Sequence, residues 1–286
     1  MIDYYETKSQ PITRKMVWEA YRVVSSNKGG SGVDGMTWTE LEKNLSGQLY
    51  KLWNRLSSGS YYPPPVMQVE IAKKGGGMRK LGIPTLLDRI AQQVVRRRLE
   101  VMLEPKFHEH SYGYRPGRSA HDAVAQSQRN CFNHDFVLDL DIQSYFDTID
   151  HELMMKALKH YGAEKWMLLY IGRWLKADIM TRQERISRVT GTPQGGVISP
   201  LLANLFLHVV FDGWMDKYHP EKPFERYADD IIVHCKTEKQ SLYMLNRIRE
   251  RMEACGLKLH QIKKKIVNLR GWSEKRYPRS YDFLGF

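Results

Sequence analysis

Apolar residues recur along the first third of the chain with two different periods. Around residues 12–27 and 39–57 they recur every three or four positions, which predicts two amphipathic helices. Residues 67–73 and 79–83 instead form extended runs, with three consecutive glycines between them. Two such runs joined by a glycine-rich connection predict a β-hairpin, and the lysines and arginine in these runs make it basic.

The rest of the chain carries signals for the starts and ends of helices. Thr85 and Ser119 are each followed three residues later by an aspartate, which predicts a capping box and a helix start at both positions. Ser199 stands before a proline and a long apolar run, which predicts another helix start. A further helix is expected at about residues 237–255, with Gly256 as its C-terminal cap.

Two apolar strands in the second half carry acidic residues. The run 227–230 (YADD) lies between apolar strands, so Asp229 and Asp230 are expected at the tip of a hairpin. Asp141 lies in another predicted strand, residues 136–142. The order of elements around these acids is strand, helices, hairpin, helix, strand. It predicts an α+β fold with helices packed on a small antiparallel sheet.

The acids on these strands predict a metal site. Carboxylates on apolar strands repel each other and resist burial, so a cation is expected beside them. Oxygen ligands from two strands suit a pair of Mg²⁺ ions acting on phosphates, and Asp141 and Asp229 are the predicted first ligands. Because neighbouring strand side chains face opposite sides, Asp230 is more peripheral if Asp229 faces Asp141. The alternative is salt bridges with basic residues, which we favour for Asp139 and Asp150.

The composition indicates a globular protein with a polyanionic partner. The 286 residues are 42% hydrophobic, and 44 Lys and Arg against 32 Asp and Glu give a net charge of +12. Nucleic acid is the simplest partner for this charge, and a basic protein without such a partner is the alternative. The three cysteines form no C-x-x-C pair, so neither a zinc site nor a disulfide framework is indicated. With no membrane-length apolar run and no signal peptide, a cytoplasmic protein is expected.

Six ordered segments of the sequence resemble the motifs of reverse transcriptases. Three of them resemble motifs A, B and C, in that order: residues 141–147 (DIQSYFD), 192–200 (TPQGGVISP) and 227–230 (YADD). The other three resemble segments of the group II intron branch of the family: residues 32–35 (GVDG), 81–84 (LGIP) with Asp88 and Arg89, and 111–119 (SYGYRPGRS). The resemblance runs from about residue 28 to the last residue.

The resemblance implies a right-hand polymerase, with fingers and palm, that copies RNA into DNA. Residues 1–120 would form mainly the fingers with part of the palm, and residues 121–286 mainly the palm. The last residues, 281–286, resemble motif E, the primer grip. The thumb and maturase region that follows in the family, and the DNA-binding and endonuclease domains, are absent, so we expect weak or distributive activity. The palm surface left exposed predicts self-association as a homodimer.

Motif A and motif C supply the catalytic residues that the resemblance implies. Asp141, Asp229 and Asp230 would hold two Mg²⁺ ions, for which Mn²⁺ can substitute. The main-chain carbonyl of Ile142 would complete one metal's shell. Phe146 would be the steric gate that excludes a 2′-hydroxyl and favours deoxynucleotides, while the residue alone favours a core aromatic.

Motif B would lie against the nucleotide being added. The resemblance implies that Gln194 contacts the incoming nucleotide and that Gly195 and Gly196 lie against it and the template base. Glycines suit this place because a backbone without a Cβ can approach a ligand closely. Taken alone, the same residues form an ordinary glycine turn.

Basic residues complete the implied nucleotide and template contacts. Lys73 and Arg79 match the finger residues that clamp the triphosphate. Lys263 is matched to the motif D cation that could protonate pyrophosphate, although the family's Pro-Glu-Lys-Thr differs from the sequence here. Arg115 and Arg118 precede a predicted helix and are expected either to contact phosphate or template or to be ordinary surface arginines.

The function implied is an RNA-directed DNA polymerase of a group II intron-encoded protein, which in its full-length form assists intron splicing and mobility. Its partners would be an RNA template, a DNA primer, dNTPs and group II intron RNA in the cytoplasm of a bacterium. One alternative is an RNA-binding maturase scaffold that polymerises weakly or not at all. Another is a related reverse transcriptase that serves phage defence or a CRISPR system.

Overall fold

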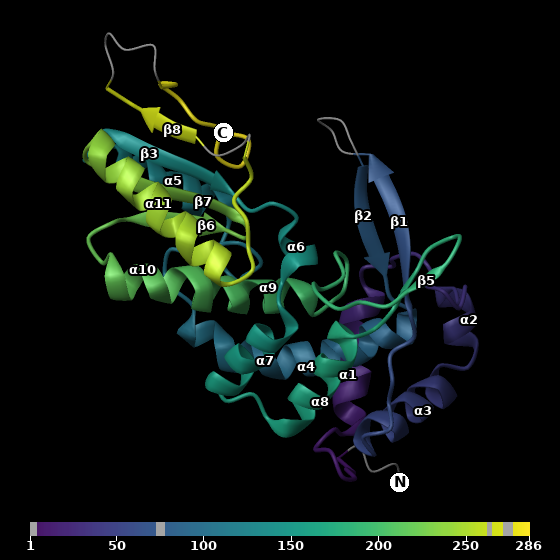
Figure 1. Cartoon of the computed structure of the whole chain (residues 1–286). Coiled ribbons are helices and arrows are strands. Elements are labelled where there is room, and N and C mark those ends of the chain that lie inside the picture. Colours follow the sequence, from purple (N-terminus) through teal and green to yellow (C-terminus); the bar gives the residue numbers. More distant parts are fainter. Residues whose placement is uncertain (1–4, 73–77, 262–264, 271–276) are drawn as a thin grey trace. The chain divides into compact units, whose positions relative to one another are not determined.

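The chain folds into two compact units, shown in Figure 1. The computed structural model describes residues 5–72, 78–261, 265–270 and 277–286. The first unit comprises residues 1–103 and 154–202, and the second comprises residues 104–153 and 203–286. The chain passes between these units three times, because residues 154–202 pack with the N-terminal segment. The expected division into mainly fingers (residues 1–120) and mainly palm (residues 121–286) stays a prediction.

Helices form most of the first unit. The predicted helix at 12–27 is present as α1, and Thr13 begins it by accepting a hydrogen bond from the amide of Met16. The single helix expected at 39–57 is two helices, because the backbone of Asn44 leaves the helical region (φ −135°, ψ 45°). The helices that lie wholly within this unit are α1 (Arg14–Ser25), α2 (Trp38–Lys43), α3 (Leu45–Ser57), α4 (Leu86–Leu103) and α8 (Lys165–Leu175).

The sheet of the first unit has the order β2-β1-β4-β5. Its strands are β1 (Val66–Ala72), β2 (Met78–Ile83), β4 (Ile179–Met180) and β5 (Arg185–Ile186). Strands β1 and β2 pair antiparallel, with Met67 opposite Ile83, which confirms the predicted hairpin. Strand β4 joins β1 in parallel, so residues 178–186 are attached to the N-terminal segment by main-chain hydrogen bonds. The glycine connection of the hairpin lies outside the described residues.

A buried carboxylate links α4 to its neighbours in the first unit. The amide of Asp88 donates to the Thr85 hydroxyl, as the capping box requires. Its carboxylate, however, accepts hydrogen bonds from Tyr61, Trp174 and Gln92 at 2.7, 2.8 and 3.0 Å instead of reaching back to Thr85. Burial raises the pKa of Asp88 against these bonds. The second half of the predicted capping box is therefore replaced by a link between α4, α8 and residue 61.

The second unit is built on an antiparallel sheet in the order β6-β7-β3-β8. Its strands are β3 (Phe136–Asp141), β6 (Phe224–Tyr227), β7 (Asp230–Cys235) and β8 (Lys265–Asn268). Helix α5 (Ala120–Cys131) contacts β6 and β7, and α11 (Glu238–Ala254) contacts β3 and β7. This arrangement confirms the predicted α+β fold with helices packed on a small antiparallel sheet.

The two faces of this sheet carry different side chains. Val137 and Ile232 form one buried cluster with Ala123 of α5. Because strand side chains alternate, Leu138 and Val233 project on the other face, toward α11. Polar residues follow the α5-side face toward the end of β3, where Asp141 lies.

The remaining helices of the described chain include one long continuous stretch. Helix α9 (Ser199–Leu207) runs into a π-helical turn, η2 (His208–Asp212), and then into α10 (Gly213–Tyr218). The capping box of Ser119 and the left-handed Gly256 (φ 78°) after α11 are confirmed. Ser199 is the first residue of α9, and its hydroxyl lies 2.8 Å from that of Thr192. The short elements are η1 (Glu104–Lys106), α6 (Tyr145–Thr148) and α7 (His151–His160).

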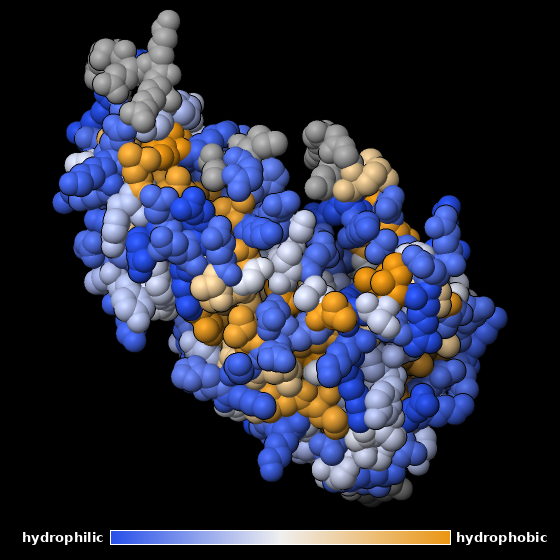
Figure 2. Space-filling model, viewed as in Figure 1, coloured by the Kyte–Doolittle hydropathy of each residue, from blue (hydrophilic) through white to orange (hydrophobic). Residues whose placement is uncertain are grey.

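One face of the molecule is mainly polar (Figure 2), in keeping with the charge of the chain. The face shown in Figure 2 is mainly hydrophilic, with hydrophobic side chains gathered in scattered patches. Within the described ranges, no helix has both the length and the apolar character needed to cross a bilayer. None of the three cysteines forms a disulfide.

A histidine buried in the second unit is held in its charged form. His234 on β7 is fully buried, and its Nε2 lies 2.7 Å from Glu225 and 3.5 Å from the hydroxyl of Ser127. Burial alone lowers the pKa of His234, but hydrogen bonds and charge interactions with Cys131 and Glu225 outweigh it and raise the pKa to about 9. The protonated histidine therefore stabilises the folded state.

This pair predicts a loss of stability in alkaline solution. The folded pKa is raised above the unfolded value of about 6.5, so the stabilisation is complete below pH 6.5 and is lost as the pH rises through 9. A shift of this size corresponds to about 3 kcal/mol. Urea unfolding between pH 6 and 10 should show this loss, and the His234→Gln variant should show a much flatter profile. Parallel profiles for the parent and the variant would contradict the assignment.

Candidate active site

The β6–β7 hairpin carries two of the predicted catalytic acids at its tip. Tyr227 is paired with Asp230, so Ala228 and Asp229 form a two-residue turn. Ala228 has a φ of 56°, in the left-handed region that residues with a side chain adopt at a cost of about 1 kcal/mol or more. Such strain persists only where neighbouring contacts fix the backbone. The hairpin tip is therefore a place where the surrounding structure enforces one conformation.

Asp141 and Asp230 are brought together by strand register. Asp141 ends β3, Asp230 begins β7, and the two residues are direct partners across the antiparallel pair. Directly opposed residues project on the same face, with Cβ atoms about 5 Å apart. The sequence expectation made Asp230 the peripheral carboxylate on the condition that Asp229 faces Asp141. The register instead places Asp230, and not Asp229, directly opposite Asp141, while Asp229 lies in the adjoining turn.

Main-chain pairing beside Asp141 leaves an oxygen for a cation. The carbonyl of Asp141 accepts from the amide of His260, and the amide of Gln143 donates to the carbonyl of Lys258. These two hydrogen bonds do not use the carbonyl oxygen of Ile142. The residue Ile142 is paired with Leu259 as an isolated antiparallel β-bridge. Within the part of the chain that the structure describes, no three His, Cys, Asp or Glu side chains cluster as a metal site. The fitting donors are carboxylate and carbonyl oxygens, which suit a hard divalent ion with open coordination positions.

A buried arginine fixes the strand that leads into the turn. Arg226 is fully buried, and its guanidinium donates two hydrogen bonds to the carboxylate of Asp212 at 2.7 and 2.6 Å. It also donates to the carbonyl of Ala228 at 3.1 Å, which ties the left-handed turn residue to the core. Burial raises the pKa of Asp212, but the charge and hydrogen bonds of Arg226 outweigh it and lower that pKa to about 2.

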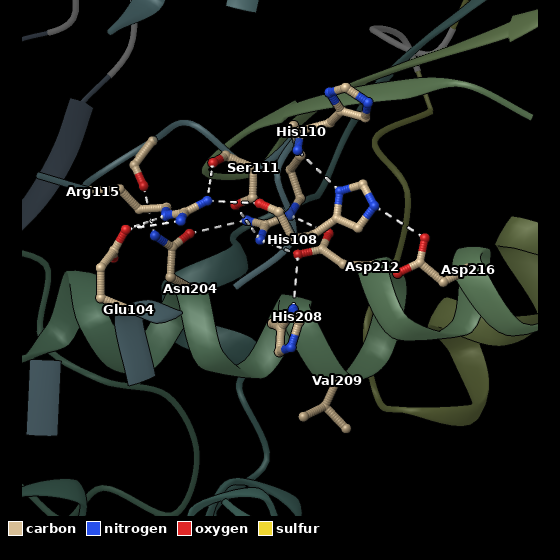
Figure 3. Close-up of polar contacts among 12 residues, drawn as sticks. Glu104, His108, His110, Ser111, Arg115, Asn204, His208, Val209, Asp212 and Asp216 are labelled. Atoms are coloured by element: carbon tan, nitrogen blue, oxygen red, sulfur yellow. Dashed lines mark hydrogen bonds and ion pairs between the residues drawn. The ribbon is translucent and has the colours of Figure 1, made fainter. Parts of the chain in front are cut away.

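Two more segments meet at this arginine (Figure 3). Arg226 donates to the hydroxyl of Ser111 at 2.7 Å and to the side-chain oxygen of Asn204 at 3.0 Å. Asn204, His208 and Asp212 project from the continuous helical stretch of α9 and η2, and His208 lies 3.4 Å from Asp212. Helix, hairpin and the segment at Ser111 are thus joined through one buried charge.

A glycine allows the segment after Ser111 to lie against the hairpin turn. The carbonyl of Gly113 accepts a hydrogen bond from Asn204 at 2.5 Å. A Cβ atom at Gly113 would collide with the backbone nitrogen of Ala228. The amide of Tyr112 donates to the carbonyl of Arg226 at 2.8 Å, which aligns this segment with β6. The position of Gly113 therefore requires glycine for backbone packing.

The sequence reasoning missed Arg226 and Asp212. The available signal was the alternation in β6: Tyr227 shares a face with Asp230, so Arg226 must project to the opposite, covered face. A charged residue on a covered face needs a partner, and the carboxylate that Arg226 contacts, Asp212, lies 14 residues earlier in η2. That pairing follows from the fold and not from a local motif.

Phe146 lies among aromatic side chains. It is buried in α6, and its ring centroid lies 5.7 Å from that of Tyr145 and 6.4 Å from that of Tyr114, edge-on in both cases. The hydroxyl of Tyr145 donates to the carbonyl of Ala203 at 2.5 Å. Burial and the negative charge of Asp229 raise the pKa of Tyr145, against the effect of Arg226. Phe146 is thus held firmly, as either a core aromatic or a gate requires.

In the first unit, two predicted nucleotide-binding residues meet. The guanidinium Nε of Arg79 on β2 donates to the side-chain oxygen of Gln194 at 2.8 Å, and the amide of Gly82 donates to the carbonyl of Gln194 at 2.7 Å. Gly195 has a φ of 114°, and a Cβ there would lie 2.5 Å from the carbonyl oxygen of Gly82. A Cβ at Gly196 would lie 2.5 Å from the Ser199 hydroxyl. These glycines are therefore required by packing within the unit, in addition to any approach to a ligand.

The remaining predicted cations differ in their surroundings. Arg115 donates to Glu104 at 2.9 Å and to the carbonyls of His108 and Ser111 at 2.6 Å, and its side chain is 5% exposed. The predicted template contact does not fit this buried arginine, which instead holds its own loop. Arg118 is exposed and stays a candidate for template contact. Lys73 and Lys263 lie outside the described residues.

Comparison with known proteins identifies the family. Residues 71–286 match the family model described as reverse transcriptase (RNA-dependent DNA polymerase). Protein YkfC of Escherichia coli K12 is 34% identical over 81% of this chain and 59% of its own length. Group II intron-encoded protein LtrA of Lactococcus lactis subsp. cremoris is 37% identical over 66% of this chain and 32% of its own length. The chain thus spans between a third and three fifths of these relatives.

A solved structure supports the fold. Telomerase from Candida albicans, in complex with a fragment of telomeric RNA, superposes with a TM-score of 0.60 at 14% identity, over 86% of this chain and 47% of that one. At this identity the likeness concerns the fold alone, and it agrees with the fingers-and-palm architecture. The match to the family model covers most of the chain and includes the hairpin carboxylates, Asp141 and the loop at Gln194. The chain belongs to the reverse transcriptase (RNA-dependent DNA polymerase) family.

Proposed function

We propose that this chain is the polymerase portion of a group II intron-encoded protein and extends a DNA primer on an RNA template. The single observation that carries the proposal is the register of β3 and β7. It sets Asp141 opposite Asp230, with Asp229 in the adjoining turn, within a reverse-transcriptase fold. Carboxylates from two strands at one sheet end are the donors that nucleotidyl transfer requires.

The residues of the second unit have defined roles in this proposal. Asp141, Asp229, Asp230 and the carbonyl of Ile142 would hold two Mg²⁺ ions, with Mn²⁺ as a substitute. Ions held by these residues would supply Lewis-acid activation of the primer hydroxyl and charge neutralisation on the leaving pyrophosphate. The main-chain ladder at residues 141–143 and the clamp from Arg226 to Ala228 hold these oxygen donors in place. Phe146 would exclude a 2′-hydroxyl.

Residues of the first unit would bind the nucleotide. Arg79 presents a forked cation to a triphosphate, and its bond to Gln194 orients the guanidinium. Gly195 and Gly196 would lie beside the base pair being formed. The predictions for Lys73, Lys263 and Arg118 stand, as additional phosphate or template contacts.

The biological setting follows from the relatives. Similarity to a group II intron-encoded protein supports intron RNA as a partner and a role for the full-length protein in splicing and mobility. A net charge of +12 supports binding of RNA template and primer. Three cysteines without a disulfide are in keeping with the bacterial cytoplasm. Self-association as a homodimer stays a prediction.

Nucleotide selection tests the proposal. The parent chain should extend a DNA primer on an RNA template with Mg²⁺ and should prefer dNTPs to rNTPs. The Phe146→Val variant should reduce that preference at least about tenfold, because the wall beneath the sugar becomes smaller. The preference is measured as the ratio of kcat/KM for dCTP and CTP in single-nucleotide extension.

A matched control is Phe132→Val, which changes an exposed phenylalanine of the same unit (76% exposed) and should leave the ratio unchanged. Extension by neither parent nor variants, with RNA still bound, would overturn the polymerase proposal. It would favour an RNA-binding maturase scaffold, the second candidate that the net charge supports.

A further inference from the structure

A hollow of about 450 Å³ lies within the first unit, and none of the predicted catalytic acids lines it. Its walls come from the proline-rich segment before β1, from Met155 of α7, from the C-terminal half of α8, from residues 176–178 before β4 and from Arg185 of β5. Three cationic side chains line it, Arg173, Lys176 and Arg185, against one carboxylate, Asp178. The lining therefore carries an excess of positive charge.

Arg173 is a fixed cation in this hollow. Its guanidinium donates to the carbonyls of Gly59 and Tyr61 at 2.8 and 2.5 Å. Its Cζ lies 3.9 Å from the ring centroid of Tyr62 and 5.6 Å from that of Tyr170. Carbonyl groups satisfy N–H donors without cancelling the unit charge, so the position of Arg173 is set while its charge remains. An oriented guanidinium is well suited to phosphate.

Tyr62 offers a ring to solvent beside this cation. It is 68% exposed even though its ring lies over Arg173. Three prolines follow directly, residues 63–65, and they restrict the backbone to an extended form that cannot relax into a helix. The ring is thus presented by a stiff segment, and little conformational entropy is lost when a ligand stacks on it.

The other two cations differ in their pairing. Arg185 lies 2.5 Å from Asp178, so this pair is nearly neutral. Lys176 is exposed, and it caps the C-terminal end of α8 three residues after Arg173. The positive charge that remains at the hollow is therefore that of Arg173 and Lys176.

A structural role at the end of α8 is the simpler explanation for the two cations. Positive side chains near a helix C-terminus interact favourably with its dipole. That role accounts for Arg173 and Lys176, but it requires neither a hollow nor an exposed tyrosine stacked on the guanidinium. Aromatic rings interleaved with cations are instead the pattern by which proteins bind single-stranded nucleic acid.

We propose that this hollow binds single-stranded RNA, with a phosphate at Arg173 and Lys176 and a neighbouring base stacked on Tyr62. The predicted metal-binding carboxylates do not line this hollow, whose lining residues all belong to the first unit. It rests on the proposed function only in the choice of RNA as the polyanion. A nucleotide held here anchors RNA without being a substrate.

Salt-dependent RNA binding tests this site. Fluorescence anisotropy with a labelled 20-nucleotide single-stranded RNA gives Kd at several KCl concentrations. Lys176→Gln should raise Kd several-fold and reduce the slope of log K against log salt by about 0.7, the value for one lost phosphate contact on a single strand. Tyr62→Ala should raise Kd about tenfold through the lost stacking, and Tyr62→Phe should restore binding.

Lys51→Gln is the matched control, because it removes the same charge from an exposed lysine of the first unit that does not line the hollow. It should change neither Kd beyond about twofold nor the slope by more than about 0.2. Equal effects of Lys176→Gln and Lys51→Gln, or normal binding by Tyr62→Ala, would overturn the site. If Lys176→Gln and Tyr62→Ala weaken RNA binding but the parent chain extends no primer, the polymerase proposal is overturned and the RNA site at this hollow stands.

Discussion

Primer extension by the Asp141→Asn variant is expected to fall at least about 1000-fold, because removing one charged oxygen ligand forfeits roughly 4 kcal/mol of transition-state stabilisation. Asparagine keeps the shape of the side chain and its place opposite Asp230. Binding of template–primer should therefore stay within about twofold of the parent, since phosphate contacts dominate that affinity. Single-turnover extension and anisotropy, measured on the same preparation, separate the two quantities.

Asp216→Asn is the matched control, because Asp216 is an exposed aspartate of the same unit outside the six resembled motifs. It should extend primers at the parental rate. Asp229→Asn should match Asp141→Asn, as the family resemblance implies, and Asp230→Asn should lose less. If Asp230→Asn loses as much as Asp141→Asn while Asp229→Asn keeps activity, the metal ligands are the two directly opposed residues. Parental activity in all three would mean that the site is elsewhere.

Arg226→Met is expected to destabilise the chain by about 3–5 kcal/mol, because it leaves the buried carboxylate of Asp212 without its partner. The turn at Ala228 also loses the hydrogen bond that holds its left-handed backbone. Variants that still fold should therefore show a reduced kcat with little change in the KM for dNTP. Urea unfolding monitored by tryptophan fluorescence gives the free energy of unfolding. Steady-state primer extension gives kcat and the KM for dNTP separately.

The double variant Arg226→Met/Asp212→Leu should recover much of the lost stability, because no unpaired charge remains. It should not recover kcat, because Ala228 still lacks its donor. Recovery of both would make Arg226 a purely structural residue. As a control, Arg247→Met at the exposed pair with Glu250 should change stability by less than about 1 kcal/mol.

The pair of Arg226 and Asp212 also makes the free energy of unfolding depend on pH in acid solution. The folded pKa of Asp212, about 2, lies below the unfolded value of about 3.9. The stabilisation is therefore fully present above about pH 4 and is lost as the pH falls through 2. At neutral pH, where extension is assayed, the clamp is complete.

Much of the fold follows from local patterns. The alternation at 136–142 and 227–233, and the glycine connection after residue 72, were enough to predict the strands and both hairpins. Local steric rules likewise predicted the capping box at Ser119 and the left-handed Gly256. These elements are determined within a few residues, so sequence reasoning reached them.

Contacts between distant segments were beyond that reasoning. The carboxylate of Asp88 accepts hydrogen bonds from Tyr61 and Trp174. Arg115 donates hydrogen bonds to Glu104 and to main-chain carbonyls. Each pattern looked local, as a capping box or a surface arginine. Burial determines the actual contacts of these two side chains, because a buried charged group needs partners and these come from any part of the fold. The strand register that opposes Asp141 and Asp230 also depends on the whole hairpin and not on the YADD motif alone.

The interleaving of the two units constrains the order in which the growing chain can fold on the ribosome. The first unit lacks α8 and β4 until residue 180 has been made, and by then the residues of β3 have already been made. Its partner β7 begins about 90 residues after Asp141, a delay of roughly 5 to 18 seconds at ordinary rates of synthesis. During that interval an apolar strand waits with both edges unpaired. Slow stretches of translation between residues 141 and 230 should therefore increase aggregation of the nascent protein.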